Sequence, residues 1–174
     1  MDIAEKINRF NAYTDLVSAA NKLVGVTAEV TLPEFEFTSE TLSLAGMAGE
    51  VDSPSMGQVK STQIEIPFSN VSYEMFRILA DDNASVILRA AQEKIETDSL
   101  KKTHIGRVVT VKGMTKKVNY GKLVKGGYGN PSITKEVIYY KDELDGKVLT
   151  EVDKFNGKYV VNGQDIMADI EELI

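Results

Sequence analysis

Apolar and polar residues alternate along most of this chain, which is the pattern of strands with one buried face. The alternation is clearest in Ser61–Phe68, where Ile64 and Ile66 are flanked by Gln63 and Glu65. The same period predicts further strands over Ala84–Glu96, Ile105–Met114, Ile133–Tyr140 and Lys147–Asp153.

Another alternation surrounds Pro33. It passes through Val30 and Leu32 before the proline and resumes at Phe35 after it. We expect a strand over 28–32 that ends at Pro33, because proline cannot donate a hydrogen bond to a strand ladder.

Turn signals separate the predicted strands. Asp145-Gly146 and Asn156-Gly157 favour the positive φ of tight hairpin turns. Residues 119–131 contain four glycines and end at Pro131, which predicts a longer connection between two strands.

Helical spacing is confined to short stretches. Val71, Met75 and Leu79 share one face of a predicted helix, Val71–Leu79, and Ser69, Asn70 and Ser72 are its candidate caps. A second helix is predicted over Gln164–Ile174, where Ile166, Met167, Ile170 and Ile174 form an apolar stripe. Ile3, Ile7 and Phe10 have the spacing of a third helix.

These elements predict one mainly β domain over residues 1–174. We expect a β-sandwich or a partly open barrel, covered by one or two short helices at about Val71–Leu79 and Gln164–Ile174. The length of 174 residues is sufficient for one core, and no repeat or linker divides the chain.

Composition removes most catalytic chemistry. The chain has no cysteine and a single histidine, His104, which excludes disulfides, thiol nucleophiles and paired-histidine metal sites. The glycines of Lys122–Asn130 match the spacing of neither common phosphate loop. Glu50 and Asp52 alone offer too few oxygens for calcium. We therefore expect no enzyme activity, no cofactor and no metal.

Nothing in the sequence indicates a membrane protein. The first residues carry acids early and lack the apolar core of a signal peptide. No stretch approaches the roughly 20 apolar residues of a membrane-spanning helix. We expect a protein made in the cytoplasm that does not itself bind membranes.

Charge is segregated along the chain, whose formal net charge is −6. No Lys or Arg occurs from Leu23 to Val59, and no Asp or Glu occurs from Lys101 to Lys125. The two blocks are either solvated strand faces or complementary surfaces of neighbouring subunits. The basic residues of the second block are Lys101, Lys102, Arg107, Lys112, Lys116, Lys117, Lys122 and Lys125.

Residues 41–57 are the candidate interface between subunits. The segment is too apolar for a freely solvated loop, and its three glycines make it a poor strand or helix. Either it folds back over its own core or, as we favour, it becomes ordered against another chain. The candidate contact residues are Leu42, Leu44, Gly46, Met47, Gly49, Glu50, Val51, Asp52, Pro54 and Met56.

Several motifs occur in a specific order and spacing. They are FNAYTD at Phe10–Asp15, LVGV at Leu23–Val26, TLP at Thr31–Pro33, AGMAGEVDSP at Ala45–Pro54 and DKFNGKYVVNGQDIMADI at Asp153–Ile170. With these motifs the chain resembles the major tail tube proteins of contractile-tailed, P2-like bacteriophages and of phage-tail-like bacteriocins. The stretch Leu16–Lys22 is longer than the turn that this pattern leads us to expect.

The resemblance implies a structural subunit that forms six-fold rings, stacked head to tail into the inner tube of a contractile tail. Its partners would be further copies of itself, the tail sheath protein, the baseplate or initiator, the tail terminator, the tape measure protein and, in a phage, DNA in the lumen. In a bacteriocin the tube would serve membrane puncture. The location would be a virion tail or bacteriocin particle, assembled in the bacterial cytoplasm.

Two hypotheses extend this expectation, and one alternative opposes it. The acidic and basic blocks would meet between neighbouring subunits, and part of the excess acid would line the lumen and repel DNA. The alternative is a monomeric β-barrel module that binds a small ligand or, through its basic block, a nucleic acid.

Overall fold

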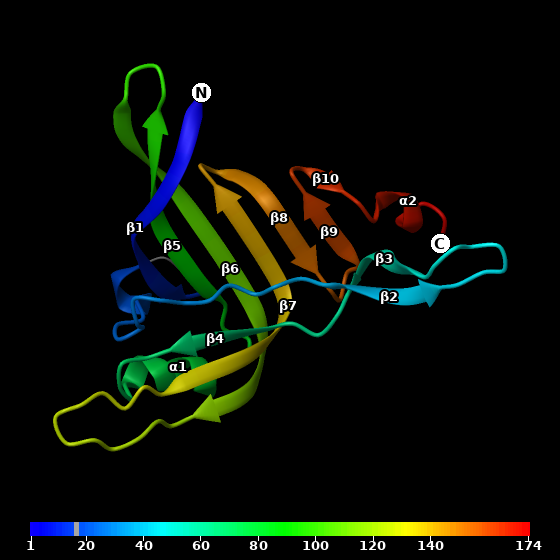
Figure 1. Ribbon diagram of the computed structural model, residues 1–174. Coiled ribbons are helices and arrows are strands. Elements are labelled where there is room, and N and C mark those ends of the chain that lie inside the picture. Colours follow the sequence, from blue (N-terminus) through cyan, green and yellow to red (C-terminus); the bar gives the residue numbers. More distant parts are fainter. Residues whose placement is uncertain (16–17) are drawn as a thin grey trace.

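The computed structural model describes residues 1–15 and 18–174 and consists mainly of strands (Figure 1). Within these residues one sheet has eight strands and a separate hairpin has two. The large sheet has the order β1-β5-β6-β7-β8-β9-β10, and β4 also pairs with β7. Its two ends do not pair with each other, so the sheet is not closed into a barrel. The prediction of a mainly β fold with few short helices is confirmed.

Connections between the elements range from tight turns to the long segments 22–36 and 120–131. The strands are β1 (Asp2–Thr14), β2 (Phe37–Leu42), β3 (Val51–Val59), β4 (Gln63–Pro67), β5 (Val86–Glu96), β6 (Lys101–Asn119), β7 (Ser132–Leu144), β8 (Lys147–Asp153), β9 (Lys158–Val161) and β10 (Gln164–Asp165). The helices are η1 (Ala19–Asn21, a 3-10 turn), α1 (Tyr73–Ala80) and α2 (Ala168–Glu171).

Antiparallel hairpins build the sheet. β5 and β6 pair without interruption from Val86↔Val111 to Glu96↔Lys101, and β6 then pairs with β7. The predicted turn at Asp145-Gly146 joins β7 to β8, and both residues have positive φ, as tight hairpin turns require. The strands predicted over 61–68, 84–96, 105–114, 133–140 and 147–153 are all present.

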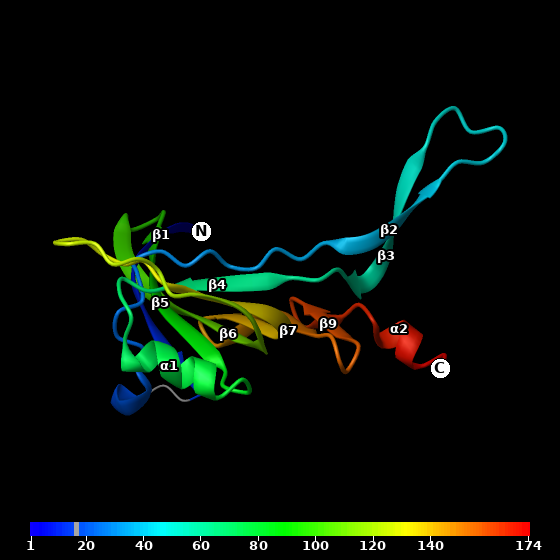
Figure 2. The same cartoon turned by 90° about the horizontal axis from the view of Figure 1, so that it is seen from below.

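The core lies on one face of the sheet. Leu88 of β5 and Val109 of β6 are buried there together with Ile64 and Ile66 of β4. Met75, the buried side chain of α1, joins the same cluster. The segment that precedes β2 crosses over this face of the sheet, and β4, which pairs with β7, runs beside that segment (Figures 1 and 2). The two together cover the core.

The strand predicted over 28–32 is wrong. The chain is extended between Val26 and Phe37 but belongs to no ladder. Val30, Leu32 and Phe35 pack partly buried against the core instead. Alternation therefore shows only that one side of an extended segment is buried and the other exposed. An extended segment can have this pattern without pairing with a neighbouring strand.

The helical spacing at the N-terminus is also misleading. Ile3, Ile7 and Phe10 lie in β1, which pairs with β5 from Asp2↔Glu96 to Thr14↔Val86. Register shifts on both sides of Ile7 interrupt the period of two and leave a spacing that imitates a helix.

The two predicted helices differ in outcome. The first is confirmed as α1, whose N-cap Ser72 accepts a hydrogen bond at its Oγ from the Met75 amide, 3.3 Å away. The second is shorter than Gln164–Ile174, because Gln164 and Asp165 pair with β9 as a strand. Only Ala168–Glu171 is α-helical.

No helix in the described part of the chain has both the length and the apolar character needed to cross a membrane. Of the long stretch noted at Leu16–Lys22, Leu16 and Val17 lie outside the described residues; Ala19–Asn21 form the 3-10 turn η1.

Candidate functional site

The hairpin of β2 and β3, residues 37–59, projects from the body of the molecule, and we call it the arm (Figure 2). Its strands are in register from Ser39↔Pro54 to Leu42↔Val51, so the loop at the tip is limited to residues 43–50. The prediction that 41–57 is too Gly-rich for a strand is wrong, because 51–57 belong to β3. Pro54 is tolerated because β3 has a strand neighbour on one side only.

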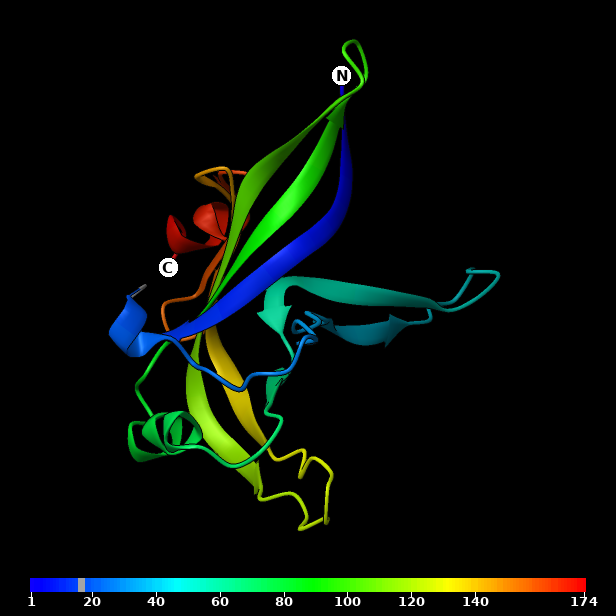
Figure 3. The same ribbon diagram turned by 90° about the vertical axis from the view of Figure 1, so that its left-hand side faces the viewer.

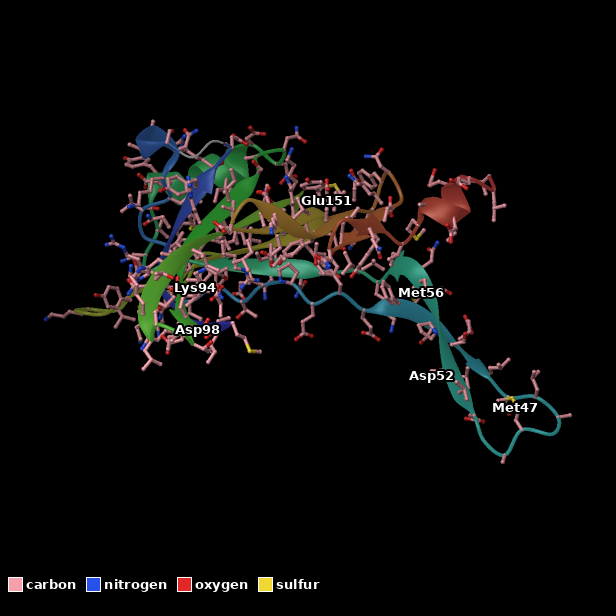
Figure 4. The ribbon with its side chains drawn as sticks, turned by 90° about the horizontal axis from the view of Figure 1, so that it is seen from above. Met47, Asp52, Met56, Lys94, Asp98 and Glu151 are labelled. Atoms are coloured by element: carbon pink, nitrogen blue, oxygen red, sulfur yellow. The ribbon has the colours of Figure 1, made fainter. Side chains whose placement is uncertain are left out.

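The arm exposes apolar side chains. Leu44, Val51 and Met56 are each more than half exposed, and Met47 sits at the tip (Figure 4). An isolated two-stranded hairpin is at best marginally stable in water, and clustered exposed apolar groups mark contact surfaces. Within the described residues, nothing covers these apolar side chains of the arm.

Charge on the arm has one sign. Glu40, Glu50 and Asp52 are exposed, and the sequence contains no Lys or Arg between Leu23 and Val59 to balance them. The Asp52 carboxylate accepts a hydrogen bond from Thr41 Oγ1, 2.9 Å away across the hairpin. The arm is therefore an acidic and apolar projection.

The eight basic residues of the second block do not form one surface. Three of them have acidic partners within the chain. Lys102 Nζ lies 2.9 Å from Glu5 Oε2, and this bond raises the pKa of Lys102. Lys116 lies 3.6 Å from Glu136.

Arg107 is the third, and it is turned toward the covered face of the sheet. Its Nε and Nη2 donate to Asp142 Oδ1 and Oδ2 at 3.0 and 2.6 Å. The carboxylate raises the pKa of Arg107. Asp142 is buried and also accepts a bond from the Tyr140 hydroxyl. Arg107 therefore stabilises the fold rather than belonging to an open basic surface.

The other basic residues are spread along the 19 residues of β6 and the connection after it. Lys101 begins the strand, and Lys112 lies over the Tyr139 ring, 5.7 Å from its centroid. Lys117 lies near the far end of β6, and Lys122 and Lys125 are exposed in the connection to β7. At this far end Lys116, Lys117, Lys122 and Lys125 are all exposed.

A second apolar surface lies at that far end, and sequence reasoning missed it. We call it the end patch: Val71, the outer side of α1 and residues 120–128. Leu123 is fully exposed and Tyr73 is 91% exposed. The rings of Phe76 and Tyr120 stack with their centroids 6.4 Å apart, which joins the helix to the loop. Its exposed apolar residues are Val71, Tyr73, Phe76, Tyr120, Leu123, Val124 and Tyr128. The available signal was that Tyr73 and Phe76 fall outside the buried stripe of the helix.

The face of the sheet opposite the core is polar and carries both charges. Lys158 pairs with Glu151 at 3.2 Å and Lys141 with Glu143 at 3.1 Å. Glu93 accepts a hydrogen bond from Asn8 Nδ2, and this bond contributes most to lowering its pKa. The face is therefore a polar surface with many internal ion pairs.

The outer edge of β1 lacks a neighbouring strand over most of its length. In the described residues only its end is engaged, where Tyr13 forms a bridge with Lys22 and the Leu23 amide donates to Ala12 O. Beside this edge lies a cavity of about 440 Å³, lined by residues 8–12 and 22–28. Backbone groups along such an edge are available to another strand.

The cavities of the described chain differ in size and polarity. Besides the one at the β1 edge, a second cavity of about 470 Å³ is lined by Asp82, Lys112 and Tyr139 among others. The apolar pocket between β1 and the covering segment, lined by Ile7, Phe10, Val30 and Leu32 among others, measures only about 110 Å³. Ligand sites commonly measure about 300 Å³ or more. In the described part of the chain, no group of His, Asp and Glu residues could hold a metal ion.

Comparisons with known proteins complete these observations. The family model described as "Phage tail tube protein FII" matches residues 4–174. The chain is similar in fold to one in the cryo-EM structure of the anti-feeding prophage (AFP) baseplate, 6-fold symmetrised, with a TM-score of 0.51 and 13% identity. That similarity covers 83% of this chain and 97% of the other. No curated protein sequence matches.

Proposed function

Because the chain belongs to the phage tail tube protein FII family, we propose that its copies form six-fold rings that stack head to tail into the inner tube of a contractile tail. Family membership makes it a structural subunit of a tail tube. The six-fold symmetry of the AFP baseplate, which contains a chain of similar fold, supports the ring size.

The observation that carries the proposal is the arrangement of two unlike surfaces. The arm projects from one end of the molecule and the end patch lies at the other, as Figures 1 and 2 both show. A surface that matches a different surface on the next copy makes a heterologous contact, which generates rings where the rotation closes and filaments where it does not. A stacked tube requires both kinds of contact.

Ring formation also provides for the open edges of the sheet. β1 at one end and β9–β10 at the other are edge strands. Unpaired strand edges promote association, and natural proteins cover, shorten or pair them. Pairing the edges of neighbouring copies would extend the sheet around the ring.

The polar face of the sheet would then line the lumen, since the opposite face is covered by the chain itself (Figure 3). The ion pairs on this face would give a lumen of mixed charge. The hypothesis of an acidic lumen gains no support from this arrangement, because Glu143 and Glu151 on this face are paired with Lys141 and Lys158.

The other partners follow from the position of a tube in such a particle. The sheath would surround the tube, the baseplate or initiator would start it, the terminator would end it, and the tape measure protein and, in a phage, DNA would occupy the lumen. In a bacteriocin the same tube would puncture a membrane. Assembly would take place in the bacterial cytoplasm.

Electron microscopy of the purified protein over a range of concentrations tests the proposal. We expect hollow tubes with six-fold rotational symmetry at high concentration. A variant with a shortened arm has residues 43–50 replaced by Asn-Gly, which suits the Leu42↔Val51 register. It should fold like the wild type by circular dichroism but form no tubes. A protein that stays monomeric at every concentration, even with tube ends present as initiators, would contradict the proposal.

A further inference from the structure

We propose that the tip of the arm of one copy docks on the end patch of another copy, with Met47 and its apolar neighbours against Leu123 and the Phe76–Tyr120 pair. This inference rests on the proposed function and adds the surface that receives the arm.

Outside the arm, the end patch gathers seven exposed apolar side chains: two from α1, four from the loop 120–128, and Val71 just before the helix. Leu123 is fully exposed, and the stacked rings of Phe76 and Tyr120 add exposed aromatic surface to the patch. Patches of this kind on soluble proteins mark contact sites, and aromatic residues are enriched at the centre of interfaces.

The arm tip and the end patch differ in the sign of their charge. The loop of the end patch carries Lys122 and Lys125, and the sequence has no acid between Lys101 and Lys125. The helix α1 adds one charge of each sign, Glu74 and Arg77, so the patch keeps a net positive charge. The arm tip carries Glu50 and Asp52 and no base. A mainly apolar centre with a charged rim of opposite sign on each partner is the anatomy of a specific interface, in which the charges set register and association rate.

The arm and the end patch lie at opposite ends of the molecule (Figures 1 and 2). The arm of a chain cannot be expected to cover its own end patch, because the two project from opposite ends of the molecule (Figures 1 and 2). The same pair of surfaces on successive copies, however, repeats in one direction. The contact therefore fits an assembly in which identical subunits repeat in one direction.

Cysteine cross-linking tests the contact directly, because the chain has no cysteine of its own. Met47→Cys is introduced into a chain with a mass tag and Leu123→Cys into an untagged chain, and the two are assembled together and oxidised. We expect a disulfide-linked pair of unequal mass in tubes and none in unassembled protein. The matched control uses Leu173→Cys, which is also strongly exposed but lies outside the end patch, and should give no such pair.

Charge exchange is the second test. Lys122→Glu with Lys125→Glu should raise the concentration needed for tube growth by about tenfold or more, and so should Glu50→Lys with Asp52→Lys. The chain that carries all four changes should recover growth. Lys101→Glu, at the opposite end of β6, is the control and should grow like the wild type.

The outcomes separate the two proposals. Absence of wild-type tubes contradicts the proposed function itself. Tubes that form normally in Lys122→Glu/Lys125→Glu, or that give no Met47–Leu123 cross-link, overturn the docking site and leave the tube intact. All variants replace exposed side chains, so the free chain should keep the urea midpoint of the wild type.

Discussion

Met167 fills the space directly over Gly57. Gly57 lies in β3 with φ +77°, and a Cβ added there would collide with the sulfur of Met167. Met167 is itself buried, immediately before α2. The C-terminal segment therefore packs on the base of the arm, and the absence of a side chain at Gly57 is what permits that packing.

Gly57→Ala should destabilise the chain by about 2 kcal/mol or more, because it adds strain at positive φ to overpacking against Met167. Urea unfolding of the monomer measures this, and tube growth reports whether the arm keeps its direction. Gly49→Ala is the control, since Gly49 has open space around it and no positive φ. Equal stability of the two variants would contradict the role of Met167.

Arg107→Met should cost about 3 kcal/mol, because it leaves the buried Asp142 carboxylate without its cation. Lys141→Met is the matched comparison on the other face of the sheet. Its partner Glu143 is partly exposed, so the loss should stay under about 1 kcal/mol. Denaturant unfolding at neutral pH compares the two, and a similar cost for both would show that Asp142 does not depend on Arg107.

Stability should fall as pH rises above 10. Burial, reinforced by the hydrogen bond to Glu151, raises the pKa of Tyr139 from 10.0 to about 12. A group whose pKa is raised in the folded state contributes stability below its unfolded pKa and loses it as pH passes through the folded value. The free energy of unfolding of Tyr139→Phe should therefore fall less steeply between pH 10 and 12 than that of the wild type. An unchanged slope in urea midpoints over that range would contradict this.

Tube growth should slow as salt increases. Raising salt from about 0.01 M to about 1 M shortens the screening length from about 30 Å to about 3 Å, so the arm and the lysines at the end patch would attract each other less before contact. Light scattering should record a fall in elongation rate of about tenfold or more. Glu50→Gln with Asp52→Asn should show a much weaker dependence. An elongation rate of the wild type that does not change with salt would show that attraction between these charges does not contribute to tube growth.

Much of the strand content was predictable from local pattern. Ile64 and Ile66 show their buried side through alternation alone, and Asp145-Gly146 specifies a hairpin through its backbone preference. Exclusion of cysteine and paired-histidine chemistry needed only the composition. The family resemblance was likewise carried by motifs in the sequence, and the match over residues 4–174 confirms it.

Other features depended on contacts between distant residues. Ile3 and Ile7 have helical spacing, but pairing with β5 makes them a strand. Val30 and Leu32 alternate like a strand, but the core and not a neighbouring strand holds them. The extent of the second helix was misjudged because pairing of Gln164 with β9 outweighed the apolar stripe.

Local patterns and motifs were sufficient to predict a mainly β tube subunit with an unusual segment at 41–57 and segregated charge. Long-range contacts, in contrast, make this segment a hairpin arm, pair Arg107 with Asp142, and join α1 and residues 120–128 into one patch. The difference arises because alternation and turn preference act between near neighbours in the chain. Which side chains remain exposed depends on how elements far apart in sequence cover one another.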